Sequence, residues 1–206
     1  MSKEGSKLSP ESDDTPGEEN SKRNDALECE VIRGIQSWRS KLGNRFWKHW
    51  THLGEPYWWI AIGIIAAFFW RFHVTVLIGA AGFSHLATIS LMKRLYKRKR
   101  PHKACENVFP LKNSIKDHSF PSGHTYQSTV MTLSLALCYG NILLVILAFI
   151  FGASIAFSRI YIGVHYLTDV LIAYVIAVFF SFMLFLNFPL IMKVHELIRG
   201  ILLDLF

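Results

Sequence analysis

The chain has 206 residues, 51% of them hydrophobic, and a formal net charge of +7. Residues 57–92 and 123–192 are almost free of charge, whereas ten of the 15 acidic residues lie in 1–56. A soluble core would mix polar and apolar residues at the period of a helix or strand, so this pattern argues against a soluble domain and indicates an integral membrane protein. The basic excess lies beside the apolar blocks, where it orients a protein or meets anionic lipid, and we expect no nucleic acid partner.

The N-terminal part of the chain divides into two predicted segments. Residues 1–27 are polar and rich in Ser, Glu, Asp and Lys, so we expect a disordered tail, and they lack the apolar stretch of a signal peptide. Residues 28–53 mix apolar and basic side chains, which predicts an amphipathic helix at the membrane interface, or else a helix packed on the bundle. Gly54 and Pro56 then interrupt the chain, and the membrane domain as a whole is predicted over 28–206.

The first apolar block, residues 57–92, is too long for one membrane span. As a single helix its 36 residues would extend about 54 Å, against a hydrocarbon core of roughly 30 Å. We therefore expect the block to fold back near Arg71, which gives two spans at about 57–71 and 74–92.

The second apolar block holds three further predicted spans. Gly140 and Asn141 predict a tight turn within it, and a short loop at 159–164 separates the last two spans. The three spans are predicted at about 123–139, 142–158 and 165–187, after a basic loop at 93–122 and before an amphipathic tail at 190–206. The sequence thus predicts an all-α, integral membrane helical bundle of about five transmembrane helices plus the N-terminal interfacial helix.

Three short polar islands lie at the ends of these predicted spans. Lys93-x6-Arg100-Pro101 lies at the end of the second span, and Pro121-Ser122-Gly123-His124 begins the third span. The last island, Ser158-Arg159-x5-His165-x3-Asp169, joins the fourth and fifth spans. With five spans, all of these points fall on one face of the membrane, so we expect the islands to converge there.

The first and last islands supply cations that suit a phosphate. A transferring phosphoryl group spreads negative charge over its oxygens, and its stabilisation depends on positioned positive charge and hydrogen-bond donors. Arg100 and Arg159 offer planar, forked donors that match phosphate geometry, and Lys93 adds a point charge. The other basic residues of 93–100, Arg98 among them, are interpreted as lipid-facing or topogenic charge.

The second island begins a predicted helix, where free backbone N–H groups and the positive end of the helix dipole can receive an anion. Gly123 lets the backbone approach an oxyanion, and Ser122 can cap the helix and also donate to phosphate. A plain helix cap is the alternative for Ser122. An ionisable side chain at a membrane helix end, as at His124, indicates a functional role.

His165 and Asp169 form the most informative pair. Four residues apart on a helix, the two side chains lie one above the other. The carboxylate can then accept from one imidazole nitrogen, which fixes the tautomer and raises the nucleophilicity of the other nitrogen. Asp169 is also the only acidic residue between positions 118 and 195, and its burial without a partner would be costly. A purely structural polar pair is the alternative.

In order and spacing, the three islands resemble the signature of the type 2 phosphatidic acid phosphatase superfamily, which also includes glucose-6-phosphatase and vanadium-dependent haloperoxidases. The resemblance covers residues 93–169. It implies a metal-independent phosphatase without a cofactor, which acts on a lipid phosphate or diphosphate in the bilayer through a phosphohistidine intermediate. It also implies the roles of the residues: nucleophile His165, its orienting partner Asp169, general acid His124, and phosphate-binding Lys93, Arg100, Ser122, Gly123 and Arg159, with no metal ligand.

The resemblance leaves rival functions and the lipid open. Typical membrane members have six spans, and the missing one corresponds to the first, which the segment 28–53 replaces here. The rivals are a non-catalytic lipid-binding membrane protein with the same fold and a haloperoxidase. No motif distinguishes polyprenyl diphosphate, phosphatidic acid, phosphatidylglycerol phosphate, sphingoid phosphate and lipid A phosphates, or specifies an oligomeric state.

Charge and cysteine content bear on the compartment. The loop 93–116 holds nine Lys or Arg residues, and 39–48 adds four on the same side, which predicts a cytoplasmic site, whereas the resemblance implies an outer or lumenal one. Cys29, Cys105 and Cys138 are scattered, and their spacing predicts neither a disulfide framework nor a metal motif.

Overall fold

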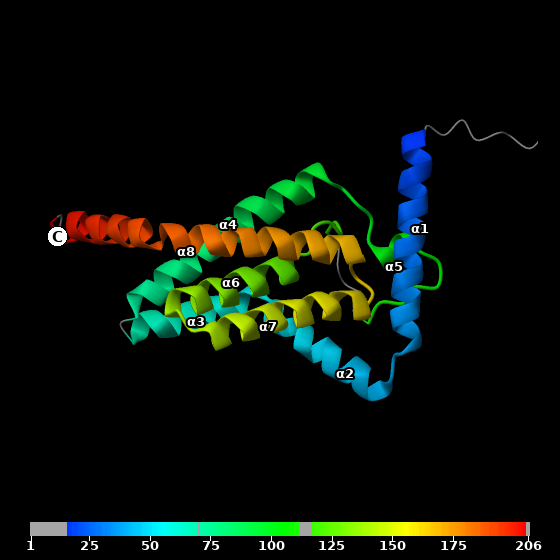
Figure 1. Cartoon of the computed structure of the whole chain (residues 1–206), viewed down its shortest axis with the longest axis horizontal. Helices are drawn as coiled ribbons and strands as arrows, with labels where there is room; N and C mark the ends of the chain where they lie inside the picture. The colour runs from blue at the N-terminus through cyan, green and yellow to red at the C-terminus, as the bar shows by residue number, and fades with distance from the viewer. Residues whose placement is uncertain (1–15, 70, 112–116, 205–206) are drawn as a thin grey trace, which may run out of the picture.

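The described part of the chain forms an elongated bundle of helices (Figure 1). The computed structural model describes residues 16–69, 71–111 and 117–204, and within these ranges its regular structure is entirely helical. In chain order the helices are α1 (Pro16–Ser37), α2 (Lys41–Trp50), the 3-10 helix η1 (Thr51–Gly54), α3 (Pro56–Phe68), α4 (Phe72–Leu95), α5 (Pro101–Ala104), α6 (Gly123–Tyr139), α7 (Ile142–Tyr161) and α8 (Leu167–Asp204). The predicted all-α fold class is confirmed.

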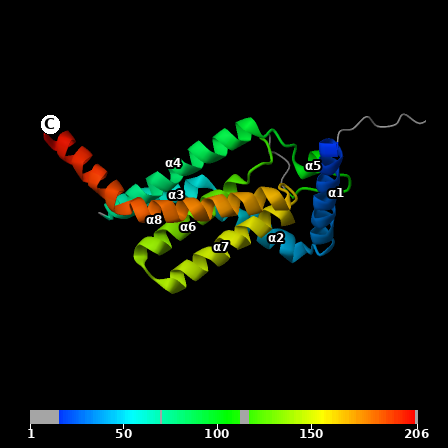
Figure 2. The ribbon, with the colours of Figure 1, turned by 45° about the horizontal axis from the view of Figure 1, so that its top comes forward.

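Helices α3, α4, α6, α7 and α8 run along the long axis of the molecule, and α1 crosses one end of them (Figure 1 and Figure 2). α6 lies against α4, α7 and α8, and most of its residues are buried. Many of these residues are small or carry a hydroxyl group, which lets neighbouring backbones approach closely. A Cβ added to Gly152 of α7 would lie only 2.4 Å from Thr129 Oγ1 of α6.

Within the described residues, three helices are long and apolar enough to cross a membrane: Phe72–Leu95, Ile142–Tyr161 and Leu167–Ile201. α3 is apolar but has 13 residues, and α6 has 17. Each predicted span therefore has one corresponding helix, and five crossings of the bilayer remain a prediction. Large apolar side chains such as Ile64, Phe83 and Ile150 are exposed on the outside of the bundle, as a surface that faces lipid requires.

Gly140 and Asn141 make the turn between α6 and α7 that their sequence predicts. Gly140 ends α6 in the left-handed region with a φ of +66°, which glycine adopts without steric cost. The Asn141 side chain begins α7 by accepting from the backbone N–H groups of Leu143 and Leu144 at 2.9 and 3.3 Å.

The N-terminal region differs from the single amphipathic helix predicted over 28–53. α1 begins inside the segment predicted to be a disordered tail, and α2 and η1 follow it as separate helices. The break arises because the Ser40 hydroxyl caps α2, accepting from the Gly43 N–H at 3.0 Å, while Arg39 donates to the last carbonyl of α7 at 3.1 Å. The rest of the predicted tail, residues 1–15, lies outside the described residues.

α8 is longer than the predicted fifth span. The sequence predicts an end near Asn187 and a separate surface helix over 190–206, whereas α8 continues to Asp204 with Pro189 inside it. In apolar surroundings the backbone groups depend on hydrogen bonds within the helix, so a single proline does not end it. Figure 2 shows α8 changing direction toward its C-terminal end.

Cys29 of α1 and Cys105, which directly follows α5, form a disulfide, with their Cα atoms 5.8 Å apart. The spacing of the cysteines predicts no disulfide framework, and this expectation does not hold for these two. They lie 76 positions apart in the sequence, and they meet because α1 crosses the end of the bundle beside α5 (Figure 1). Spacing alone carries no signal of such a contact. Cys138 is a free thiol.

Candidate active site

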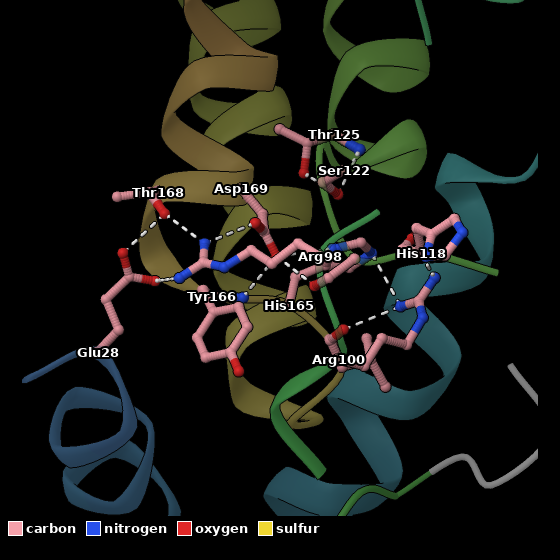
Figure 3. Close-up of polar contacts among 12 residues, drawn as sticks. Glu28, Arg98, Arg100, His118, Ser122, Thr125, His165, Tyr166, Thr168 and Asp169 are labelled. Atoms are coloured by element: carbon pink, nitrogen blue, oxygen red, sulfur yellow. Dashed lines mark hydrogen bonds and ion pairs between the residues drawn. The ribbon is translucent and has the colours of Figure 1, made fainter. Parts of the chain in front are cut away.

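The polar islands meet at the end of the bundle where α6 and α8 begin and α7 ends (Figure 3). Two hydrogen bonds tie them together. The backbone N–H of Ser122 donates to the carbonyl of Asp169 at 3.1 Å, and Arg100 Nη1 donates to the carbonyl of Val164 at 2.9 Å. The fold therefore brings residues from three separate stretches of sequence to one end of the molecule.

His165 and Asp169 are buried and in contact, with 3.3 Å between His165 Nδ1 and Asp169 Oδ2. The same carboxylate oxygen accepts from the Tyr166 backbone N–H at 3.0 Å and from the Ser119 hydroxyl. The expectation that the pair shares one helix is wrong, because α8 begins at Leu167 and His165 lies in the preceding loop. The contact forms between that loop and the first turn of α8.

Arg100 determines which ring nitrogen of His165 carries the lone pair. Arg100 Nη1 lies 3.2 Å from His165 Nε2. A guanidinium group only donates hydrogen bonds, so Nε2 is the acceptor and Nδ1 carries the ring proton that faces Asp169. The lone pair of Nε2 thus points toward Arg100.

Burial keeps this imidazole neutral. Burial, together with the charges of Arg100 and Arg159, outweighs the hydrogen bond and charge of Asp169 and lowers the pKa of His165 to about 3. The ring therefore retains its lone pair at neutral pH, as a nucleophile must.

Lys93 and Arg100 converge on one carboxylate, that of Asp117. Lys93 Nζ pairs with Asp117 Oδ2, and Arg100 Nη2 lies 2.5 Å from Asp117 Oδ1. Burial opposes ionisation, but the hydrogen bond from Lys93 and the charges of Arg100 and Lys93 lower the pKa of Asp117 to about 2. These two cations thus have the geometry to hold the oxygens of an anion between them.

Arg159 is a buried cation with one N–H group that lacks an acceptor within the described part of the chain. Its Nη1 donates to Thr51 Oγ1 of η1 at 2.9 Å, and its Nε has no hydrogen-bond partner among the described residues. An unsatisfied buried N–H is unfavourable, and an oxyanion in the site would supply the missing acceptor.

His124 lies in the first turn of α6, and its Nε2 is 3.2 Å from Glu55 Oε1. Gly54 allows this approach, since a Cβ there would lie 3.1 Å from His124 Cβ. Ser122 caps α6 through its hydroxyl, which accepts from the Thr125 N–H at 3.5 Å. The helix start, with its dipole, therefore borders the same end of the bundle as the cations.

This arrangement can bind the oxygens of a phosphoryl group and attack its phosphorus with the neutral imidazole of His165. His124 supplies a second imidazole for proton transfer. Across residues 16–69, 71–111 and 117–204, no group of three or more His, Cys, Asp or Glu side chains is placed to hold a metal ion.

A model of the PAP2 superfamily matches residues 70–193, well over half of the chain and all three islands. The chain belongs to the PAP2 superfamily. It is 35% identical over 107 residues to the undecaprenyl-diphosphatase BcrC of Bacillus subtilis (strain 168), an alignment that covers 52% of this chain and 54% of the relative. This PAP2 chain thus spans about half the length of that curated relative.

Two solved structures resemble this PAP2 chain. The crystal structure of Aquifex aeolicus LpxE has a TM-score of 0.66 and 26% identity, covering 76% of this chain and 93% of that one. The first transmembrane PAP2 type phosphatidylglycerolphosphate phosphatase from Bacillus subtilis has a TM-score of 0.67 and 22% identity, covering 81% and 86%. At that identity the second likeness supports the fold alone. The three long apolar helices and the apolar outer surface of the bundle are those of an integral membrane protein.

Several residues of the candidate site are not identified by the sequence analysis. The interpretation of Arg98 as lipid-facing charge is wrong, because its Nη1 lies 3.0 Å from Asp169 Oδ1. A position within or beside an island could have identified Arg98, Asp117 and Ser119 as candidate site residues. In a run of many basic residues, however, the sequence does not show which one faces the interior. Glu55 precedes the matched region 70–193, and no sequence pattern connects it with His124.

An apolar groove of about 590 Å³ lies between α3, α4 and α6 and borders the site. Its lining includes Trp59, Gly79, Phe83 and Met131, and also His85, whose Nε2 lies 3.3 Å from where a Cβ on Gly123 would be. Its lining also includes Pro56, which directly follows Glu55, the partner of His124. A hydrocarbon chain in this groove would therefore have its polar head beside the island residues.

Proposed function

We propose that this PAP2 superfamily member is a membrane lipid phosphatase, which hydrolyses a phosphate monoester or a diphosphate of a lipid through a phosphohistidine at His165. The observation that carries the proposal is the buried, neutral His165, held by Asp169 at Nδ1 and facing Arg100 with Nε2. The comparison with lipid phosphatases of the family and the adjoining apolar groove support it.

In the first step, the lone pair of His165 Nε2 attacks phosphorus, and the bond between phosphorus and the leaving oxygen breaks. His124 gives a proton to that oxygen, so the lipid leaves as an alcohol, or as a monophosphate when the substrate is a diphosphate. Asp169 stabilises the positive charge that the imidazole acquires. In the second step, water gives a proton to His124 and attacks phosphorus, the phosphorus–nitrogen bond breaks, and phosphate leaves.

The remaining predicted residues would hold the phosphoryl oxygens. Arg159 would donate from its unsatisfied Nε, while Lys93 and Arg100 would exchange the Asp117 carboxylate for phosphate oxygens. Ser122 and the backbone at Gly123 would contribute the N-terminal end of α6. Charge that develops on these oxygens would then meet fixed positive groups in a site largely shielded from water.

A polyprenyl diphosphate is the substrate to test first. The relative with 35% identity is an undecaprenyl-diphosphatase, and the groove offers apolar surface for a long chain. Purified protein in detergent or vesicles should release phosphate in EDTA, without an added metal ion. The other four lipid phosphates named above should be assayed beside it under the same conditions.

His165→Ala should abolish the release of phosphate, and wild-type protein stopped during turnover should carry acid-labile phosphate that this variant lacks. Turnover that survives in His165→Ala, or that requires a divalent ion, would contradict the mechanism. Tight binding of a lipid phosphate by wild-type protein without turnover on any of the five lipids would instead favour the non-catalytic lipid-binding alternative.

A further inference from the structure

We propose that Arg98 is a positioning residue of this site, which fixes the catalytic Asp169 and joins it to helix α1. The proposal rests on the proposed function, because Asp169 acts through His165. It adds a residue from within the first island, between Lys93 and Arg100, to the residues that the family resemblance assigns.

The contacts of Asp169 divide between its two oxygens. Oδ2 accepts from His165 at 3.3 Å, from the Tyr166 backbone at 3.0 Å and from Ser119, whereas Oδ1 is 3.0 Å from Arg98 Nη1. Asp169 is fully buried, so its charge needs a cation close by. By holding Oδ1, Arg98 prevents rotation of the carboxylate and keeps Oδ2 directed at His165.

Arg98 is itself held on several sides (Figure 3). Its Nη1 donates to Thr168 Oγ1 at 2.8 Å, and its Cζ lies 3.8 Å from the centre of the Tyr166 ring. Its Nη2 pairs with two carboxylates of α1, Asp25 at 2.5 Å and Glu28 at 3.2 Å. None of these partners is assigned to phosphate binding. A guanidinium so enclosed can act on the phosphoryl group only through Asp169 and His165.

The support for Arg98 comes largely from α1, which precedes the region matched by the PAP2 superfamily. Glu28 reaches across to α8, where its Oε1 accepts from the Thr168 hydroxyl at 2.7 Å. The next residue, Cys29, is covalently joined to Cys105, so the disulfide fixes α1 beside this ion network. Through Glu28 and Arg98, helix α1 therefore helps to orient the carboxylate of Asp169.

Arg98→Gln and Arg98→Lys, compared with Lys99→Gln, separate this role from others. Lys99 is an exposed neighbour that carries the same charge. We expect Arg98→Gln to lower kcat about 10- to 100-fold, as loss of a supporting hydrogen bond to a catalytic ligand typically does, and to leave KM within about twofold. Arg98→Lys should recover part of kcat, and Lys99→Gln should resemble the wild type.

A rise in KM with unchanged kcat would overturn the proposal and make Arg98 a phosphate-binding residue. A lower melting temperature with unchanged kcat per folded protein would also overturn it, in favour of a purely structural role. If Arg98→Gln does not fold, Glu28→Gln replaces it, with a smaller expected fall in kcat, because it removes one anchor of the guanidinium.

A titration of His165 tests the proposal without turnover, and so separates it from failure of the proposed function. Nitrogen-15 NMR of histidine-labelled protein follows protonation of the ring. Without the Arg98 charge, the Asp169 carboxylate attracts a proton on His165 more strongly, so His165 should titrate at higher pH in Arg98→Gln than in Lys99→Gln. Should both variants titrate as the wild type does, Arg98 does not act on the pair. If the wild type hydrolyses no lipid, the comparison of the His165 titrations still decides whether Arg98 acts on the pair of His165 and Asp169.

Discussion

Arg100 joins the proposed phosphate-binding residues to the proposed nucleophile, His165. Its guanidinium contacts His165 Nε2, the Val164 carbonyl and the Asp117 carboxylate at the same time, which a lysine ammonium cannot do with fixed geometry. We therefore predict that Arg100→Lys lowers kcat/KM about 10²- to 10³-fold, the size of effect seen when one donor to a developing oxyanion is lost. Steady-state kinetics on the preferred lipid measures this, and an effect below about threefold would show that charge alone suffices there.

Asp117 occupies the cations that a phosphate would need. Its carboxylate competes with any anion for Lys93 and Arg100, so Asp117→Asn should bind inorganic vanadate, a phosphate mimic, more tightly. A half-exposed ion pair is worth roughly up to 1 kcal/mol, which predicts about a two- to fivefold lower inhibition constant. Weaker inhibition in Asp117→Asn would instead show that Asp117 mainly orients the two cations.

The pH dependence of Asp117 follows from the sign of its shift. Its pKa falls from 3.8 to about 2, so the stability that it gives is complete above pH 3.8 and is lost as the pH falls through about 2. Between about pH 5 and 8 the wild-type carboxylate stays ionised, and the ratio of the two inhibition constants should be constant there. A ratio that approaches one toward pH 5 would show that Asp117 titrates nearer its ordinary value.

At the scale of the elements, α3, α4 and α6 form the groove proposed for the lipid chain. Gly79 of α4 lines the groove, and a Cβ there would meet no atom within 4 Å, so a leucine can enter without disturbing the backbone. We predict that Gly79→Leu lowers kcat/KM for a long polyprenyl diphosphate at least about tenfold and leaves a short-chain analogue unaffected. Gly200→Leu, in open space on α8, is the matched control, and equal loss on both substrates would place the lipid elsewhere.

The elements show why the central residues of the candidate site can be selected from the sequence. Charged side chains in long apolar blocks are expensive, so Asp169, Arg159 and the histidines near them stand out without knowledge of the fold. Their positions at predicted helix ends then indicate one end of the bundle. His165 and Asp169 meet although the helix boundary lies two residues later than predicted, because the loop and the first turn of α8 bring them equally close.

The unpredicted contacts all depend on how separate elements pack. Arg98 is distinguished from neighbouring cations by its contacts with α8, which supplies Asp169, and with α1, which supplies Glu28. Likewise Cys29 meets Cys105 only because α1 crosses the bundle. Periodicity and spacing describe one element at a time, and so they cannot reveal which residue of a polar segment another helix will cover.

At the scale of the whole molecule, the disulfide and the site lie at one end, and the C-terminus of α8 lies at the other (Figure 1). Disulfides form and persist in oxidising compartments and are rare where thiols are kept reduced. The Cys29–Cys105 bond therefore indicates that this end faces the outside or a lumen, in agreement with the resemblance and against the charge bias.

Four of the thirteen basic residues behind the charge bias have partners in the folded protein. Arg98 and Arg100 pair with carboxylates, Lys93 pairs with Asp117, and Arg39 donates to backbone carbonyls. The positive-inside rule counts Lys and Arg residues beside the spans, and nine others remain in 93–116 and 39–48, so the count still favours a cytoplasmic site. The disulfide and the charge count thus point to opposite sides, and the disulfide, which persists only in an oxidising compartment, is the stronger of the two.

We therefore predict that the site faces the oxidising side of the membrane, and cysteine labelling in intact cells can test this. In a Cys138→Ser background, Cys29→Ser leaves Cys105 as the single thiol, and a membrane-impermeant maleimide should label it before the cells are permeabilised. The Cys138→Ser protein with both other cysteines should resist labelling until an impermeant reductant opens the disulfide, because its thiols are joined. Labelling of Cys105 only after permeabilisation would place the site in the cytoplasm, where glutathione and thioredoxin would keep Cys29 and Cys105 reduced. The ion network around Arg98 would then have to hold α1 in place without its covalent link.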